Sequence, residues 1–200
     1  MSRESPYNGS MTIQDILRES YEKTLKALVM GTSPESLARA RERAFVKSLA
    51  TAFEGRYEGE EFRVFSLYGR GNRADFGGEQ LLFDLEVCRV ASASSAERKQ
   101  ESFYVVTEAL WQIEIDLSQD WRRVVFAMNR LRCGAAGNKL VIAAAPGARQ
   151  ERFLKTLEQP DAVRGEAFYL ATIPHPRDWE DDEESLKIWQ FGEGEWQGVM

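Results

Sequence analysis

Apolar residues recur at helical spacing in the N-terminal quarter of the chain and predict two helices there. The periodic stretches span 12–30 and 33–53, with a break at Gly31 between them. Thr12 and Asp15 have the spacing of a capping box, in which each side chain bonds the backbone amide of the other. The second stretch opens with Ser-Pro, a sequence typical of a helix N-terminus. We therefore expect a helix, a break and a second helix before the first strand.

Strand-like and helical segments alternate over the remainder of the chain. Apolar or alternating segments predict strands at 62–67, 81–88, 103–117, 139–145, 167–173 and 186–191, with a Ser/Ala-rich connection at 91–100 and the last strand at a sheet edge. Helical spacing predicts helices at 121–132 and 148–157. The continuous apolar run at 139–145 favours a buried strand that is parallel to the strand before the intervening helix. The order α-α-β-β-β-α-β-α-β predicts an α/β fold, with a mixed central sheet flanked by helices.

The segment 111–117 places two acidic residues at alternate positions of an otherwise apolar strand. Side chains two residues apart on a strand share a face, so Glu114 and Asp116 are expected about 7 Å apart along it. The opposite face is apolar and is expected in the core; it comprises Trp111, Ile113, Ile115 and Leu117. A further acid, Asp84, interrupts the apolar run 81–87. Buried acids are costly unless paired, protonated or metal-bound, so the three together suggest a divalent-cation site.

Each of these acids also has a purely structural interpretation. Asp84 could be a hydrogen-bonded residue at a strand edge. Glu114 and Asp116 could lie on a solvated sheet face, each paired with a basic residue; the candidates are Arg122, Arg123 and Lys139. Three other acids are expected outside the site: Glu86 as an exposed strand residue, Glu108 roughly 20 Å away along the strand, and Glu42 in a surface salt bridge.

The composition indicates a single globular domain. The 200 residues are 43% hydrophobic and 11% aromatic, which suffices for a sizeable core. We expect a disordered arm over 1–10, a single α/β domain over 11–177 and an acidic segment over 178–200. That segment holds eight acidic residues and one basic residue, a net charge of −7 within a chain total of −6. The rest of the chain is nearly neutral, which argues against strong non-specific binding of nucleic acid but permits a local basic cleft.

Missing residue types and motifs argue against several functional classes. The only histidine, His175, lies between two prolines, which disfavours His-based nucleases, zinc hydrolases and Ser-His-Asp triads. There is no GxxxxGK[ST] sequence to bind a nucleoside triphosphate. Without an apolar run that spans a bilayer, and without a signal-peptide core in 1–10, we expect a cytoplasmic protein with no membrane partner. Cys88 and Cys133 fit no metal-binding spacing and are expected to be buried, reduced thiols.

The order of elements and the positions of the acids resemble a known nuclease family. A helix, a strand, a strand with Asp84, a strand with Glu114 and Asp116, a helix and an apolar strand follow one another within about 35–145. This arrangement resembles the core of the PD-(D/E)XK nuclease superfamily. The resemblance implies a restriction-endonuclease-like fold, Mg²⁺ or Mn²⁺ held by Asp84 and Glu114, and phosphodiester hydrolysis on DNA.

One position departs from the family pattern. The family motif is acid-x-Lys, and Asp116 occupies the lysine position. Some members with acid-x-acid still cleave DNA, whereas others have lost activity and keep the fold. Asp116 could add a metal ligand or position a water molecule. Arg130 or Arg132, on the helix that follows, could supply the missing positive charge.

Two functional hypotheses follow from these observations. The first is a metal-dependent nuclease in DNA defence or repair, with Asp84, Glu114, Asp116 and Arg130 as its catalytic residues. The second is an inactive protein of the same fold that acts as an interaction or regulatory module. The absent lysine favours the second, and so does the acidic segment over 178–200, whose three tryptophans in or beside the acidic run could form a surface for a protein partner.

Overall fold

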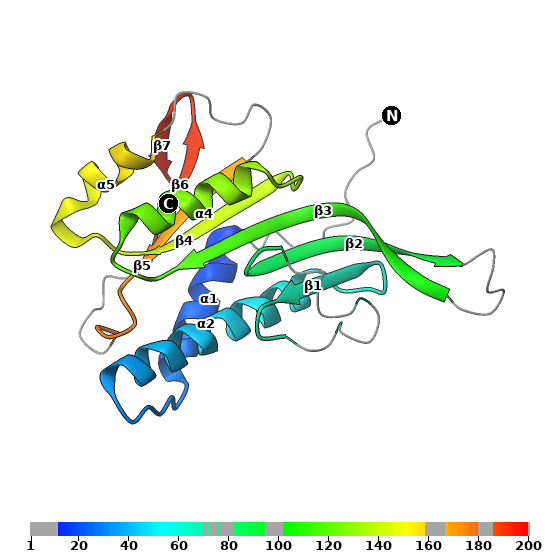
Figure 1. Ribbon diagram of the computed structural model, residues 1–200, viewed down its shortest axis with the longest axis horizontal. Coiled ribbons are helices and arrows are strands. Elements are labelled where there is room, and N and C mark those ends of the chain that lie inside the picture. The colour runs from blue at the N-terminus through cyan, green and yellow to red at the C-terminus, as the bar shows by residue number, and fades with distance from the viewer. Residues whose placement is uncertain are drawn as a thin grey trace.

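A seven-stranded mixed sheet organises the part of the chain that is described in the computed structural model, namely 12–69, 72, 76, 82–94, 102–158, 167–179 and 186–199. The strands are β1 (Phe62–Ser66), β2 (Leu85–Ser94), β3 (Ser102–Asp116), β4 (Asn138–Ala144), β5 (Ala167–Ile173), β6 (Lys187–Gly192) and β7 (Glu195–Gly198). The helices are α1 (Ile13–Lys26), α2 (Pro34–Arg56), α4 (Trp121–Arg132) and α5 (Gln150–Leu157), the last preceded by the short 3₁₀ turn η1 (Gly147–Arg149). Helices α1 and α2 cover one face of the sheet and α4 and α5 the other (Figure 1). The predicted α/β class with a helix-flanked mixed sheet is therefore confirmed.

The strands follow their sequence order across the sheet, and the type of pairing between neighbours changes twice. β1, β2 and β3 pair antiparallel, β3, β4 and β5 pair parallel, and β6 and β7 return antiparallel. The parallel β3–β4 pair requires a crossover, which α4 provides, because parallel neighbours cannot be joined by a tight turn. The predicted parallel placement of the apolar strand beside β3 is confirmed.

The starts of α1 and α2 agree with the sequence, but α2 ends at Arg56 instead of about residue 53, and α1 ends early. Both Thr12 and Ser33 form capping boxes at the starts of α1 and α2. α1 was expected to continue to about residue 30, but it ends at Lys26. The chain must turn early, because at Gly31 the backbone lies so close to the backbone of Leu37 that a Cβ atom would clash.

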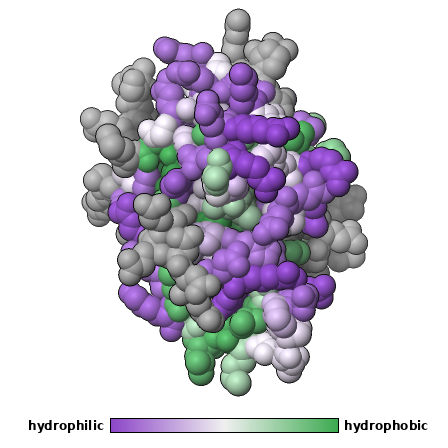
Figure 2. Space-filling model, turned by 90° about the vertical axis from the view of Figure 1, so that its left-hand side faces the viewer, coloured by the Kyte–Doolittle hydropathy of each residue, from purple (hydrophilic) through white to green (hydrophobic). Residues whose placement is uncertain are grey.

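The turn between α1 and α2 carries exposed apolar side chains. Leu28 and Met30 are 93% and 82% exposed. Apolar atoms gather at the foot of the face in Figure 2, at the height where Figure 1 places this turn. Leu28 and Met30 continue the apolar spacing of the helix but do not pack on the core. The spacing therefore predicts a longer α1 than the structure has.

Two apolar cores flank the sheet, and β3 separates them. Its odd-numbered residues, including Trp111, Ile113 and Ile115, pack with α1 and α2, as predicted. The second core lies between the sheet and α4 and α5, and contains Val141, Phe153 and other buried side chains. Near the end of β3 the even-numbered residues Gln112, Glu114 and Asp116 alternate with the apolar odd-numbered ones and are polar although buried. Two of these residues, Glu114 and Asp116, belong to the candidate functional site.

Three boundaries differ from expectation, each for a physical reason. β2 begins at Leu85 and continues through Ser94, into the expected connection, because β3 is long enough to pair with it throughout. Asp84 therefore precedes the strand instead of interrupting it. The expected edge strand near 186–191 is β6, which lies between β5 and β7, because the chain turns back at Glu193-Gly194, both with positive φ.

The acidic segment joins the fold at both ends of its described part. Trp179 is buried against Tyr21 and Phe45, and its indole N–H donates to the Pro174 carbonyl at 2.7 Å. β6 and β7 add two strands to the central sheet. The acids within 180–185 and the expected arm at 1–10 lie outside the described residues.

Two further expectations concern membranes and thiols. Within the described residues, none of the helices is long and apolar enough to cross a membrane. Cys88 is buried and free, as expected, and burial raises the pKa of its thiol to about 12. Cys133 is free but exposed, contrary to expectation, because it follows the last residue of α4 at the helix end.

Candidate functional site

Asp84 is fixed at the point where β2 begins. Its Oδ2 accepts a hydrogen bond from the backbone N–H of Ile115 at 2.8 Å, so the side chain joins β3 two residues beyond Ile113, the last β3 residue paired with β2. Burial raises the pKa of Asp84, and the negative charges of Glu114 and Asp116 raise it further, while the Ile115 amide and Arg130 oppose the rise. The carboxylate is therefore held in place and lies beside other acids.

Glu114 is buried and paired with an arginine from α4. Only 3% of its side chain is exposed, and Arg130 engages both carboxylate oxygens, through Nε at 2.8 Å and through a terminal guanidinium nitrogen. This fork is the bidentate geometry that arginine forms best with a carboxylate. Arg130 itself is 56% exposed, so the pair connects a buried acid to the surface.

Asp116 makes a second pair of the same kind. Its Oδ2 accepts from Nε of Arg123 at 2.7 Å, and its Oδ1 accepts from the backbone N–H of Ser118 at 3.0 Å. The residue ends β3, and its bond to Ser118 shapes the turn that leads to the Asp120 N-cap of α4. Arg123 was among the predicted partners, but the acid is only 10% exposed, so the expected solvated face is in fact buried.

Glu42 on α2 approaches the same acids. Burial raises its pKa, and the charges of Asp116 and Asp84 raise it further, while Arg123 and Arg39 act against the rise. Among the described residues it has neither an ion pair nor a side-chain hydrogen bond. The expected surface salt bridge is therefore not formed. Glu42, Asp84, Glu114 and Asp116 are called the acid cluster below.

The charges of the acid cluster are not balanced. Fully ionised, its four carboxylates carry −4, and the paired Arg123 and Arg130 return +2. A remainder of −2 matches one divalent cation, and carboxylate oxygen is the ligand type that Mg²⁺ prefers. Both oxygens of Glu114 are taken by Arg130, however, and among the described residues three or more acids, histidines or cysteines do not converge into a ready metal cage. The donor chemistry fits Mg²⁺, but Arg130 must leave Glu114 before that residue can bind it.

A second polar group lies one step further along the same sheet face. Glu86, Gln112 and Lys139 sit opposite one another on β2, β3 and β4 and are all buried; we call them the inner row. Gln112 donates to Glu86 at 3.5 Å and accepts from the backbone N–H of Ala136 at 3.2 Å. Lys139 donates to the Gly134 carbonyl at 3.0 Å.

Glu86 in this row corrects an expectation. It was expected to be exposed, but the residue is 6% exposed, because Gln112 and the turn after α4 close over this part of the sheet. Burial raises its pKa to about 7, with hydrogen bonds from Gln112 and the Leu82 backbone opposing the rise. The sequence did not predict the burial of Glu86, because a single acidic residue in a strand gives no sign of which residues will cover it.

The remaining candidates lie elsewhere. Glu108 pairs with Arg89 at 3.2 Å on the exposed part of β3, outside the acid cluster as expected. Arg132 has neither a hydrogen bond nor an ion pair with any described residue, so of the two arginines that could supply the missing charge only Arg130 reaches the acids.

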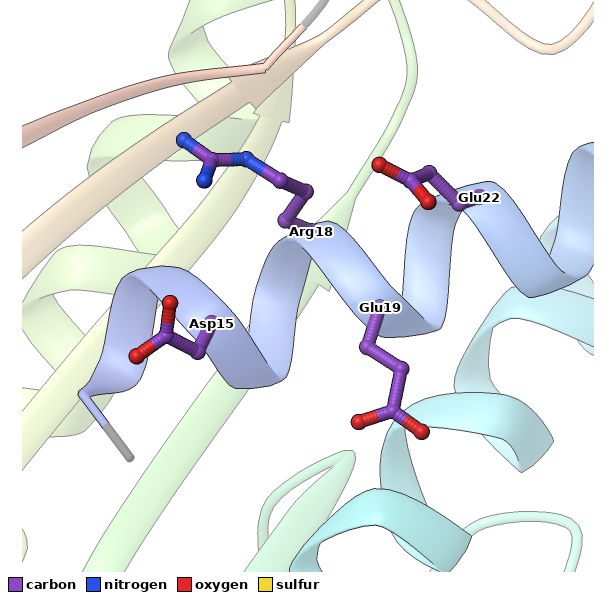
Figure 3. Close-up of a pocket in the computed structure, with 4 residues that line it drawn as sticks. All are labelled: Asp15, Arg18, Glu19 and Glu22. Atoms are coloured by element: carbon purple, nitrogen blue, oxygen red, sulfur yellow. The ribbon is translucent and has the colours of Figure 1, made fainter. Parts of the chain in front are cut away.

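A surface hollow along α1 is separate from the acid cluster. It is lined by Asp15, Arg18, Glu19 and Glu22. Figure 3 shows these four side chains leaving one helix in different directions, without converging on a common point. Asp15 is already engaged with the Thr12 cap, which lowers its pKa. The lining of the hollow therefore provides no convergent set of ligands for a metal ion or a phosphate.

The acid cluster combines two features that seldom occur together in a merely structural polar core. Glu42 and Asp84 keep carboxylates without a cationic partner among the described residues, and Arg130 leads from the buried Glu114 to solvent. Carboxylate oxygens are the ligand type that hard cations prefer, and an exposed guanidinium is a donor for anionic groups. Comparison of the chain with family models, with curated proteins and with solved structures yields no match.

Proposed function

We propose that this protein is a divergent metal-dependent nuclease that hydrolyses phosphodiester bonds in DNA, in the manner of the PD-(D/E)XK superfamily. The observation that carries the proposal is the approach of Asp84 to Glu114 and Asp116, which lie thirty and more residues further along the chain. Asp84 bonds the backbone of Ile115, and the charges of both other acids raise its pKa. The residues that the sequence suggests for a metal site thus share one small region.

The topology supports the same proposal. α2 precedes an antiparallel β1–β2–β3 meander, and α4 connects β3 to the parallel strand β4. This is the order of elements on which the resemblance to the superfamily rests, and the acids stand at the start of the second strand and near the end of the third. Because one fold can serve many functions, the acids carry more weight than the topology.

In this proposal each residue has a distinct task. Asp84 and Glu114 would hold Mg²⁺ or Mn²⁺, and the metal would supply Lewis acidity toward a phosphate oxygen and a more acidic water. Hydrolysis then joins a water oxygen to phosphorus and breaks one ester P–O bond, leaving a phosphate monoester and a hydroxyl group. Asp116, with Arg123 as its partner, orients the end of β3, and Arg130 supplies positive charge near the site. DNA as the substrate follows from the resemblance.

A second candidate function is favoured by the two arginine pairs. Arg130 and Arg123 already neutralise Glu114 and Asp116, as expected of a nuclease fold that has lost its metal and kept its acids as structural pairs. In that case the protein would act as an interaction or regulatory module. The unpaired Glu42 and Asp84 favour the nuclease, since a purely structural site gains nothing from two further buried acids that repel each other.

Metal titration separates the two functions. We expect Mn²⁺ to bind the wild-type protein in calorimetry, and Asp84→Asn or Glu114→Gln to lower the affinity about 100-fold or more, because each removes a proposed ligand. Glu108→Gln, which removes an exposed acid from the same strand, is the matched control and should bind as the wild type does.

DNA cleavage provides the second measurement. Linear and supercoiled DNA incubated with Mg²⁺ should be cut by the wild type and by Glu108→Gln, but not by the two ligand variants. If the wild-type protein binds no Mn²⁺ and leaves DNA intact, while all variants remain folded, the nuclease proposal fails and the interaction module stands.

A further inference from the structure

We propose that two copies of this chain associate by antiparallel pairing of the first part of β3, so that their two sheets join across a twofold axis at Tyr104. The interaction surface is the backbone edge and the open face of residues 102–106, called the β3 edge below. The inference is independent of the proposed function, because it involves neither the acid cluster nor a metal ion.

The hairpin of β2 and β3 extends beyond both of its neighbouring strands. β1 pairs with β2 only as far as Arg89, and β4 pairs with β3 only from Trp111 onward. Among the described strands, residues 91–94 and 102–106 therefore pair only with each other. Figure 1 shows these two strands reaching past β1 at the right of the molecule. A two-stranded hairpin is only marginally stable in water, so this one gains from a third strand.

The β3 edge exposes apolar side chains on one face. Phe103 and Val105 are 45% and 38% exposed, and they share a face because they are two residues apart on a strand. Tyr104 lies on the other face, where its ring stacks on that of Phe76 with the centroids 6.2 Å apart. The face of Phe103 and Val105 is therefore the one that a further strand can cover.

The β3 edge lacks the features that usually keep edge strands apart. Natural edge strands carry lysines, prolines or bulges that prevent pairing with another chain. Residues 102–107 read Ser-Phe-Tyr-Val-Val-Thr, without a charge, a proline or a glycine, and most of these residue types favour strands. Both register shifts of β3 against β2 follow Val106, so residues 102–106 form a regular strand. Further along β3, the Asn138 side-chain amide already donates to the Leu110 carbonyl at 3.1 Å.

A second copy of the chain fits this edge better than a foreign peptide does. Twofold pairing at Tyr104 supplies both copies with a third strand at once. It also places Phe103 of each copy opposite Val105 of the other, which is a favourable aromatic and β-branched cross-strand pair. No like charges meet, because residues 102–106 are uncharged. A foreign strand is usually recognised through pockets for alternate side chains, and the hollow described above lies on α1 instead.

Sedimentation velocity on the full chain over a dilution series is the first test. We expect the wild type to form a reversible dimer. Val105→Lys should raise the dissociation constant about 100-fold or more, because each lysine would be buried against Phe103 of the other copy. Phe126→Lys makes the same kind of change at a 60% exposed apolar residue on α4 and should leave the dissociation constant unchanged.

Disulfide cross-linking tests the position of the twofold axis and does not depend on the lysine variant. In a Cys133→Ser background, a mixture of Phe103→Cys and Val105→Cys chains should form a disulfide-linked dimer with oxidised glutathione. Opposed residues in an antiparallel pair have Cβ atoms about 4.5–5.5 Å apart, close enough for a disulfide after a small adjustment. Either variant alone should cross-link far less, because its own copies are diagonal neighbours about 7–8 Å apart. Cys88 is buried and should not compete.

Three results would overturn the proposal. The first is a wild-type protein that stays monomeric at every concentration at which it is folded. The second is a dimer that survives Val105→Lys and gives no selective cross-link in the mixture, since its interface then lies elsewhere. The third comes from amide hydrogen exchange, in which the protection of residues 102–106 should rise with protein concentration. Full protection in the monomer would show that another segment of the chain already covers the β3 edge.

Discussion

The β3 acids of the acid cluster lie on the same side of the central sheet as the inner row, yet the two groups are built differently. In the acid cluster, Glu114 and Asp116 meet arginines that are 56% and 64% exposed. In the inner row, Glu86 and Gln112 bond to each other, and Lys139 bonds to a backbone carbonyl. The cluster is linked to solvent through its cations, whereas the inner row is closed.

The difference separates a candidate site from a structural network. A closed group must satisfy its polar atoms internally, since unmet buried donors and acceptors are costly. The inner row is buried throughout, it contains the Gln112–Glu86 hydrogen bond, and burial raises the pKa of its Glu86 carboxyl group to about 7. The acid cluster instead retains excess negative charge, because Glu42 and Asp84 have no cationic partner among the described residues.

The largest effect on stability is expected for the Arg130–Glu114 ion pair, which joins an exposed side chain to a buried one. Arg130→Ala should lower the free energy of unfolding by about 3 kcal/mol at neutral pH, because Glu114 remains as an uncompensated buried charge. Glu114→Gln should cost only about 1 kcal/mol, since Arg130 can turn into water and the amide keeps the shape. Urea unfolding of both variants measures the asymmetry.

An equal loss for the two variants would contradict this picture. It would mean that the pair acts as one symmetric structural unit and that Arg130 cannot reach solvent.

The fold could largely be predicted from the sequence because its elements are locally encoded. The capping boxes at Thr12 and Ser33 and the apolar alternation of β3 each specify one element without reference to distant residues. The misplaced boundaries depend on partners: β2 lengthens because β3 pairs with it, and β7 exists because β6 offers it an edge. The composition of one strand does not show which other strand will pair with it or over what length.

The candidate site could be predicted only in part. The proximity of Asp84 to Glu114 and a role for Arg130 were expected from the resemblance to the nuclease superfamily, whereas spacing along β3 alone predicted that Glu114 and Asp116 share a face. The approach of Glu42 and the burial of Glu86 were not, since they depend on how α2 packs and on what covers β2. The sequence therefore indicates which residues share an element more reliably than which surfaces are covered.

Glu86 of the inner row should make the stability of the protein depend on pH. The pKa of Glu86 is about 7 in the folded protein and 4.5 when unperturbed, so between these values the folded state binds a proton that the unfolded state lacks. The contribution of Glu86 to stability is therefore constant below pH 4.5, falls as pH rises to 7 and stays low above it.

Glu86→Gln should remove this penalty. We expect the variant to be more stable than the wild type by about 1 to 3 kcal/mol at pH 8 and by much less at pH 4.5, because glutamine mimics the protonated acid. Chemical denaturation at both pH values measures the difference. A variant less stable than the wild type at pH 8 would show that the Glu86 carboxylate has a cationic partner and that the inner row belongs with the acid cluster.

The smallest effect is expected for the exposed pair at the far end of the same strand. Arg89 and Glu108 meet at 3.2 Å, but their side chains are 44% and 55% exposed, so water already solvates both charges. Glu108→Gln should therefore change the free energy of unfolding by less than about 0.5 kcal/mol, and added salt should remove even that. β3 thus offers a graded series in which the cost of losing a partner follows the burial of the group left behind. Equal costs at Glu108 and at the Arg130–Glu114 pair would mean that burial does not set these energies, and the distinction between the acid cluster and an ordinary surface pair would lose its physical basis.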